Sequence, residues 1–363
     1  MTQKLIAIVG LVWGDEGKGK IVDELITDNS IVVRANGGGN AGHQVHVEKN
    51  GQLEKRTTHV SPSGLMHNAA IAIGPQVAFD PIQFLKELED ARTDIGYDNR
   101  VLISERVGVL LPYHIALDTF EEMGAGSIGS TNSGIGPFYR DNANRKTRIT
   151  FRDFVSDHFP ERLREVLQLK ERELKDAGIL HRGYEEELLA AHETARKELA
   201  QFAVRLEYRL KDHMERGGDV LVEGAQASGL DVDLGTIPYT TSSHLTAPHL
   251  LASLELPRGA FKILGVEKIY PTRVGKGPMP TYDSEFDAQV VPNAGEVGAK
   301  TGRRRRAGYP DWVFVRRSAR MNDCDGIVIT RADNVQDMDL RVCIAYDVPG
   351  EGRTEEVPSD LEG

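Results

Sequence analysis

The chain has 363 residues, 40% of them hydrophobic, which suffices for the core of one large α/β domain or two smaller ones. A net charge of −11 argues against general nucleic-acid binding, and the mean hydropathy of −0.36, with no apolar run near 18 residues, argues against a membrane span. Two cysteines, Cys324 and Cys343, give neither a disulfide framework nor metal-ligand spacing, and the N-terminus lacks a signal-peptide pattern. We therefore expect a cytoplasmic protein.

The glycine-rich stretch from Gly10 to Lys20 is the clearest chemical signal. It follows the apolar run from Leu5 to Val9 and precedes an apolar-periodic segment that begins at Ile21. A strand, a glycine turn and a helix in this order predict a phosphate-binding loop. Gly14 to Lys20 has P-loop spacing, but Ile21 replaces the hydroxyl residue that usually binds Mg²⁺. Bound phosphate would repel Asp15, so we expect this residue to bind a metal or move a proton, the alternative being an exposed Asp in a plain turn.

A second glycine loop follows a predicted strand at residues 31–34. Residues 35–43 contain four glycines and two asparagines and end at His43, just before an alternating run at 44–47. A lone histidine is more often structural than catalytic. A loop at a strand end is nevertheless where α/β proteins build their sites, so we expect His43 to take part in the chemistry.

Strands alternate with helices along the chain. We expect further buried strands at residues 69–74, 100–103, 219–222, 262–266 and 326–330, and a helix at 81–91. This alternation predicts an α/β fold with an open, mostly parallel central sheet and helices on both of its faces.

Residues 160–216 differ from the rest, because they are charged, rich in alanine and leucine, and poor in glycine. The spacing of Leu199, Phe202, Leu206 and Leu210 predicts one long helix from about Tyr184 to Glu215, with a solvated charged face. The tail at about 346–363 is polar and glycine-rich, which predicts an edge hairpin or partial disorder.

Three more segments have anion-binding character. Residues 124–137 form a glycine- and hydroxyl-rich loop with Arg145 in reach, although a flexible linker has a similar composition. Residues 238–243 place four hydroxyls after a proline, which also fits a strand edge. Residues 301–306 carry four arginines after a glycine, and arginine grips carboxylates and phosphates bidentately. A last strand delivers Arg331 and Asp333, a possible base-recognition turn.

Six motifs occur in an order that resembles the adenylosuccinate synthetase family. They are residues 13–20, 38–43, 134–137, 222–226, 238–243 and 301–306, and the similarity extends from residue 5 to about 345. The resemblance implies a single catalytic domain over residues 1–363, with a helical insertion at about 160–216. It also implies a ligase that joins L-aspartate to C6 of a 6-oxopurine monophosphate, after a nucleoside triphosphate has phosphorylated O6.

The resemblance implies a role for each matching residue. Asp15 would take the N1 proton of the purine, and His43 would act as the general acid toward O6 and the γ-phosphoryl group. Asp15 and the Gly42 carbonyl would bind Mg²⁺. The purine monophosphate would contact Asp15, Asn40, Ser130, Thr131, Arg145, Gln226, Thr241 and Arg303. Lys300, Thr301, Arg303 and Arg305 would bind aspartate. The triphosphate would contact Gly14, Glu16, Gly17, Lys18, Gly19, Gly42, His43, Gln44, Arg305, Arg331 and Asp333. Arg145 would reach into the neighbouring subunit, so the enzyme would be an obligate homodimer.

Departures from the family pattern indicate altered purine recognition. They occur at Leu11-Val12, at Gly39, at Ser130-Thr131-Asn132 and at Arg331, and the family also extends beyond residue 363 with a segment that walls the guanine pocket. The pattern resembles the family's viral branch, which would act in a host cytoplasm. That branch uses dGMP to make N6-succino-2-amino-2′-deoxyadenylate for 2-aminoadenine DNA, and a changed donor pocket could admit ATP or dATP. Some members of the branch replace the residue at position 15. Because Asp15 is retained, IMP with GTP remains the alternative.

Two other classes of protein share single features with this sequence. A nucleotide switch that only hydrolyses would use the glycine loop but would not need the arginine run or the hydroxyl run. A nucleic-acid-binding module could use the four arginines, but it would bind with a steep salt dependence, and the acidic background opposes it.

Overall fold

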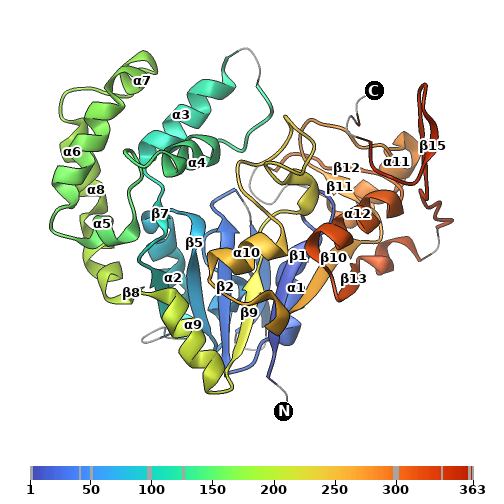
Figure 1. The fold of residues 1–363 in the computed structure, drawn as a ribbon, viewed down its shortest axis with the longest axis horizontal. Coiled ribbons are helices and arrows are strands. Elements are labelled where there is room, and N and C mark those ends of the chain that lie inside the picture. Colours follow the sequence, from blue (N-terminus) through green and yellow to red (C-terminus); the bar gives the residue numbers. More distant parts are fainter. Residues whose placement is uncertain are drawn as a thin grey trace.

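The protein is an α/β structure built on a parallel sheet, as the sequence predicts (Figure 1). The structure is a computed structural model that describes residues 3–40, 42–49, 52–95, 100–124, 127–296, 302–336, 338–358 and 361. Within these ranges, the structure describes the backbone but not the side chains of residues 43–49, 52–56, 92–95 and 293–294. No helix in the described part of the chain is both long and apolar enough to cross a membrane.

The main sheet has the strand order β13-β10-β1-β9-β2-β5-β6-β8, with β7 paired to β5, and its neighbouring strands are parallel. Its strands are β1 (Leu5–Gly10), β2 (Ser30–Gly37), β5 (Ala70–Phe79), β6 (Val101–Ser104), β7 (Gly108–Val109), β8 (Ala203–Val204), β9 (Asp219–Glu223), β10 (Lys262–Lys268) and β13 (Gly326–Thr330). Strands β2 and β5 are longer than the sequence indicated, so residues 35–37 are strand and not loop.

The helices connect and cover these strands. They are α1 (Lys18–Leu25), α2 (Pro81–Ile95), α3 (Pro112–Glu122), α4 (Ile135–Ala143), α5 (Phe151–Val155), α6 (Phe159–Leu169), α7 (Glu171–Asp176), α8 (Tyr184–Leu199), α9 (Leu206–Glu215), α10 (Ala247–Ser253), α11 (Ser284–Ala294) and α12 (Trp312–Asn322). Short 3-10 turns lie at Ser63–Met66, Ala200–Phe202, Ser228–Leu230, Arg258–Ala260 and Ala332–Val335.

Three antiparallel pairs lie outside the main sheet. They are β3 (His43–Lys49) with β4 (Gln52–Thr58), β11 (Thr272–Arg273) with β12 (Arg306–Ala307), and β14 (Tyr346–Val348) with β15 (Gly352–Thr354). The last pair confirms a hairpin in the tail.

Alternation along the central strands buries both faces of the sheet. Ala7, Val9 and Val222 pack in one cluster with Leu210 of α9 and Leu250 of α10, and these two helices lie in front of β2 and β9 in Figure 1. Ile8, Val32, Leu221 and Val266 pack in another cluster with Val22 of α1. Successive strand residues point to opposite faces, so both faces are covered by helices, as predicted.

The prediction of one helix from Tyr184 to Glu215 is wrong. The segment forms α8 and α9, with the 3-10 turn at Ala200–Phe202 and the edge strand β8 between them. Phe202 packs in the cluster with α2, α3 and α6, whereas Leu206 packs on the central sheet. A straight helix could not supply both clusters, and the break also lets Ala203 and Val204 pair with β6.

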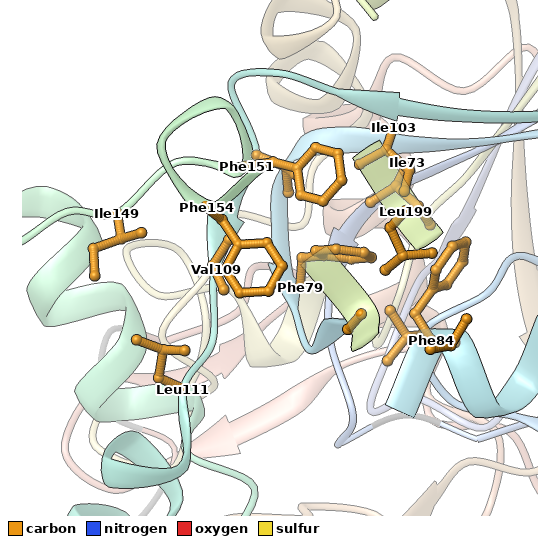
Figure 2. Close-up of a cluster of buried hydrophobic side chains, with 14 of the residues drawn as sticks. Ile73, Phe79, Phe84, Ile103, Val109, Leu111, Ile149, Phe151, Phe154 and Leu199 are labelled. Atoms are coloured by element: carbon orange, nitrogen blue, oxygen red, sulfur yellow. The ribbon is translucent and has the colours of Figure 1, made fainter. Parts of the chain in front are cut away.

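A large apolar cluster joins the helical part of the chain to the sheet edge. Figure 2 shows Phe79, Phe151 and Phe154 facing one another, with ring centroids 5.4 Å apart for Phe79–Phe151 and 6.1 Å apart for Phe151–Phe154. Phe79 comes from β5, and the other two come from α5, so their rings hold α5 against the sheet.

Truncation of Phe151 should therefore weaken the whole fold. We expect Phe151→Ala to lower the free energy of unfolding by about 3–5 kcal/mol, because it removes a fully buried ring and leaves a cavity. Urea unfolding followed by circular dichroism measures this loss. The matched control is Phe120→Ala on α3, whose side chain is 48% exposed and whose truncation should cost less than about 0.5 kcal/mol. Equal losses in the two variants would contradict the packing described here.

Candidate functional site

The glycine loop joins β1 to α1 and is held by its own side chains. Glu16 accepts hydrogen bonds from the backbone N–H of Gly14 at 2.8 Å and from Lys18 Nζ at 2.7 Å. Gly14 and Gly17 have φ values of 94° and 87°, and Asp15 has 61°, so the loop turns through the left-handed region. Glu16 and Lys18 are buried, whereas Asp15 is exposed. The Glu16 side chain therefore stabilises the loop, and its backbone is the part left for the predicted triphosphate contact.

Asp15 is one end of a chain of four charged side chains. Its Oδ2 atom lies 2.9 Å from Arg305 Nε, and Arg305 Nη1 donates to Glu296 Oε2 at 2.6 Å. Lys268 Nζ then donates to Glu296 at 3.0 and 3.1 Å. Burial disfavours the charged form of Glu296, but Lys268 and Arg305 outweigh it and hold the pKa of Glu296 below its ordinary value. Burial lowers the pKa of Lys268.

Three predicted monophosphate ligands carry buried polar atoms that have no hydrogen-bond partner among the described residues. These atoms are Asn40 Oδ1, both amide atoms of Gln226, and Thr241 Oγ1. Buried polar groups in folded proteins are almost always paired, so these atoms fit a polar ligand. The hydroxyl of Ser130, another predicted monophosphate ligand, is different because it donates to Asp118 at 2.8 Å.

The backbone on both sides of Gln226 forms a tight turn that is held by hydrogen bonds and fixes the position of this side chain. Gln226 has a φ of 54°, and a Cβ at Gly37 would lie 3.2 Å from Gln226 Oε1 and 2.5 Å from the Ala225 Cβ. Asn36 of β2 accepts a hydrogen bond from the Ala225 N–H at 2.7 Å and donates to the His244 carbonyl at 3.1 Å. Asn36 therefore ties the turn that carries Gln226 to the end of the hydroxyl run.

Asp118 on α3 holds the loop that contains Ser130, and the sequence analysis did not identify it. Its two carboxylate oxygens accept hydrogen bonds from Ser130 Oγ and from the Gly134 N–H, both at 2.8 Å. Thr131 Oγ1 lies 2.8 Å from Ser133 Oγ, so the loop is also bonded internally. This loop is thus a positioned structure and not a flexible linker. Only tertiary contact reveals the role of Asp118.

Each arginine of the run has its own partner within the chain. Arg303 Nη1 donates to the Gly129 carbonyl at 3.1 Å, and Arg304 pairs with Asp287 of α11 at 2.6 Å. Arg306 donates to the Gly275 and Gly277 carbonyls at 3.0 and 2.8 Å. The run therefore ties its own segment to two loops and to helix α11, which a nucleic-acid-binding strip on the surface would not do.

A surface pocket of about 460 Å³ lies beside Arg303. Its lining residues are Thr119, Glu122, Met123, Ser127, Gly129, Asn132, Gly275, Lys276 and Arg303. Two of these residues are cationic, and Asn132 is a position where the sequence departs from the family pattern. The predicted aspartate ligands Lys300 and Thr301 lie outside the described residues.

The predicted base-reading turn adjoins the glycine loop. Thr330 at the end of β13 donates its hydroxyl to the Glu16 carbonyl at 2.6 Å. Arg331, with a φ of 61°, and Asp333 follow it and are exposed. The structure thus brings the glycine loop next to the turn that was predicted to read the donor base.

Several predicted site residues are only partly placed. Gly42 precedes β3, and His43 begins that strand opposite Thr58, but the side chains of His43 and Gln44 are outside the description. Gly42 and Asp15 stay predicted Mg²⁺ ligands, and no group of three or more acidic, histidine or cysteine side chains that could hold a metal occurs among the described residues. Arg145 is exposed just after α4, so its action across a dimer interface also stays a prediction.

The departure from the family pattern at Leu11-Val12 lies in the protein core. Both residues are at most 1% exposed, and they pack with Trp13, Phe314 and Val315. The two side chains therefore contribute to packing against α12. An effect of this difference on the surroundings of a purine ring stays a prediction.

Glu267 at the end of β10 is a second missed residue. Its side chain is 4% exposed, and Oε2 has no hydrogen-bond partner among the described residues. Burial, and next the Glu16 carboxylate, raise the pKa of Glu267 well above its ordinary value of 4.5. The only indication of this buried Glu267 carboxylate in the sequence is that an acidic residue occurs within the apolar pattern of a buried strand.

Replacement of Glu267 by glutamine should stabilise the protein at neutral pH. The folded-state pKa lies above the unfolded-state value, so the wild type loses stability as the pH rises from the unfolded-state value through the folded-state value. We expect Glu267→Gln to gain about 1–3 kcal/mol at pH 8, and the gain should shrink toward pH 4.5. Urea unfolding across this pH range measures it. Glu351→Gln at the exposed hairpin is the control. Parallel pH–stability curves for Glu267→Gln and the wild type would refute this.

Comparisons with known proteins point to one family. A model of the family described as adenylosuccinate synthetase matches residues 7–363. The adenylosuccinate synthetase of Desulfatibacillum aliphaticivorans is 38% identical over 366 residues, which cover 98% of this chain and 84% of that protein. The one from Thermus thermophilus is 37% identical over 360 residues, which cover 97% of this chain and 85% of that protein.

Two solved structures are also similar. The fully ligated adenylosuccinate synthetase from Plasmodium falciparum matches with a TM-score of 0.90 and 28% identity, over 99% of this chain and 85% of that one. The cyanophage S-2L succinoaminodeoxyadenylate synthetase bound to dGMP and dATP matches with a TM-score of 0.63 and 20% identity, over 91% of this chain and 85% of that one. The second likeness concerns the fold alone.

Proposed function

The chain belongs to the adenylosuccinate synthetase family and is a ligase of that type, and on this premise we propose that it joins L-aspartate to C6 of IMP, with GTP as the phosphoryl donor. The product would be adenylosuccinate. The observation that carries the proposal is the set of buried polar atoms on Asn40, Gln226 and Thr241 that have no hydrogen-bond partner among the described residues. Relatives that are 37–38% identical over nearly the whole chain support IMP as the acceptor.

The proposed reaction has two steps. Asp15 takes the N1 proton of the purine, and O6 then attacks the γ-phosphorus while the bond to the β-phosphate breaks, so that GDP leaves. His43 donates a hydrogen bond to the developing charge on O6 and the γ-phosphoryl group. The aspartate amine next attacks C6, and O6 leaves with the phosphate.

The protein's own groups supply the positioning for both steps. The glycine loop and Lys18 contact the donor phosphates, and Arg303 and Arg305 contact the carboxylates of aspartate. Asp15 and the Gly42 carbonyl would hold Mg²⁺, which neutralises charge on the phosphates when it is bound. The exposed carboxylate of Asp15 and the hard oxygen of a carbonyl suit this ion.

A second candidate acceptor is dGMP. It would give N6-succino-2-amino-2′-deoxyadenylate, with ATP or dATP as the donor, on the way to 2-aminoadenine DNA. The departures at Gly39 and Asn132 favour it, because Gly39 adjoins the ligand residue Asn40 and Asn132 lines the pocket beside Arg303. A small residue at Gly39 leaves room for altered contacts with the purine.

A substrate matrix tests the acceptor and the donor together. IMP, GMP, dIMP and dGMP are each combined with ATP, dATP and GTP, with and without L-aspartate, and the succinyl nucleotide is followed by chromatography. We expect turnover with IMP and GTP. Product from dGMP but not from IMP would replace the first candidate with the second. Triphosphate hydrolysis that is indifferent to aspartate would refute the ligase proposal.

Mixed dimers test the roles of Asp15 and Arg145. Asp15→Asn should abolish ligation and leave the circular dichroism spectrum unchanged, because asparagine tolerates the left-handed backbone at this position and the loss is limited to one partly exposed ion pair with Arg305. Arg145→Ala should also be inactive by itself. Refolding the two variants together should restore roughly a quarter of wild-type activity, because half of the dimers are mixed and each has one complete site. Absence of any recovery would show that Arg145 does not act in the partner's site.

A further inference from the structure

Glu296 and Arg305 are bonded to each other twice. The Arg305 N–H donates to the Glu296 carbonyl at 3.1 Å, and Arg305 Nη1 donates to Glu296 Oε2 at 2.6 Å. The bond between the two side chains is almost completely shielded from solvent, since the Glu296 side chain is 0% exposed and that of Arg305 is 10% exposed. We propose that Glu296 is a positioning residue, which fixes the Arg305 guanidinium against Asp15 and so presents it to the aspartate substrate. This inference rests on the proposed function for its substrate.

Two contacts on different nitrogens determine how the guanidinium is oriented. Arg305 Nε forms an ion-pair contact with Asp15 Oδ2 at 2.9 Å, without the geometry of a hydrogen bond, and Nη1 donates a hydrogen bond to Glu296. A planar fork that is held at two of its nitrogens cannot rotate about its own axis without breaking a contact. Glu296 therefore fixes the plane of the Arg305 guanidinium group where this group contacts Asp15.

Exposure along the chain of charges shows which end is the anchor. The Lys268 and Glu296 side chains are 2% and 0% exposed, whereas that of Asp15 is 35% exposed. The buried pair is rigid because each of its members lies in a packed interior with its charge matched. The open end of the chain, at Asp15, is the one that a ligand can reach.

Other groups besides Arg305 hold the Glu296 carboxylate. Lys268 Nζ donates to both of its oxygens, and the Tyr270 hydroxyl lies 3.1 Å from Oε1. The Asn334 amide in turn donates to the Tyr270 hydroxyl at 2.7 Å. A carboxylate with these partners on β10 and the segment after it cannot move toward Asp15, so it acts as a fixed reference point for Arg305.

The primary test is Glu296→Gln. Glutamine keeps the shape of the side chain but removes the negative charge that attracts Arg305 and Lys268. A neutral amide oxygen holds a guanidinium group much less tightly than a carboxylate does, so the orientation of Arg305 is lost. We expect the KM for L-aspartate to rise by about tenfold to a hundredfold, since small misplacements of a binding group have effects of this size. The KM for the monophosphate and kcat should each change less than threefold. Tyr270→Phe is the matched control, because it removes a bond to the same carboxylate away from Arg305, and it should leave the KM for aspartate within twofold.

A double variant and a double-mutant cycle separate positioning from folding. Lys268→Met combined with Glu296→Gln removes the buried cation together with the anion, so it avoids the unpaired ammonium that could prevent Glu296→Gln from folding. It should show the same rise in KM. In an Arg305→Lys background, Glu296→Gln should add less than twofold. Additive effects in this cycle, or a lower Tm with an unchanged KM, would overturn the proposal.

A spectroscopic readout keeps this inference separate from the proposed function. In nitrogen-15 spectra the Arg305 Nε–H, assigned by its loss in Arg305→Lys, should exchange slowly in the wild type and in Tyr270→Phe. It should broaden or vanish in Glu296→Gln. This holds even if the wild type consumes no aspartate, which would refute the proposed function alone. A retained Nε–H signal in Glu296→Gln would refute the positioning role.

Discussion

Parallel pairing of β1 with both β9 and β10 is the constraint on which the site depends. It sets the carboxyl ends of these strands side by side, so that the glycine loop, Gln226 and the Glu267–Lys268 pair emerge at one edge of the sheet. Pairing of β2 with β9 adds Asn36 and Asn40 to the same edge. Ligands of α/β sheets bind at such edges. The backbone hydrogen bonds of the sheet therefore place the segments of the candidate site next to one another.

The charges at this edge are stable because each buried group is matched or kept neutral. Glu16 pairs with Lys18, and Glu296 pairs with Lys268 and Arg305. Glu267 lies near the Glu16 carboxylate, and burial together with Glu16 favours its protonated form. These arrangements keep the like charges of Glu16 and Glu267 from destabilising the loop, and they leave Asp15 as the exposed carboxylate of the set.

Much of the fold and part of the site could be predicted from local pattern. The strands at 219–223 and 326–330 were found because buried parallel strands are short apolar runs bounded by turns. Asp15, Gln226 and Thr241 were singled out because they lie in motifs. Asp118 and Glu296 were missed because their roles come from hydrogen bonds to residues 12 and 9 positions or more away in the sequence. Glu267 was missed because its role comes from burial and from Glu16, which lies 251 positions away in the sequence. The break between α8 and α9 was missed because helical spacing in a sequence does not show that Phe202 and Leu206 pack in two different hydrophobic clusters.

The arginine run shows why composition alone misdirects. Four consecutive basic residues suggest a cationic strip for a polyanion, but extended and turned backbone sends neighbouring side chains in different directions. Here Arg304 reaches Asp287, Arg305 reaches Asp15 and Glu296, and Arg306 reaches the 275–277 turn. Arg305 reaches its two acceptors through different nitrogens, Nε and Nη1, which a guanidinium group allows and a lysine ammonium group does not. The run thus connects two loops and helix α11, and Arg305 is the member of it that Glu296 holds in place.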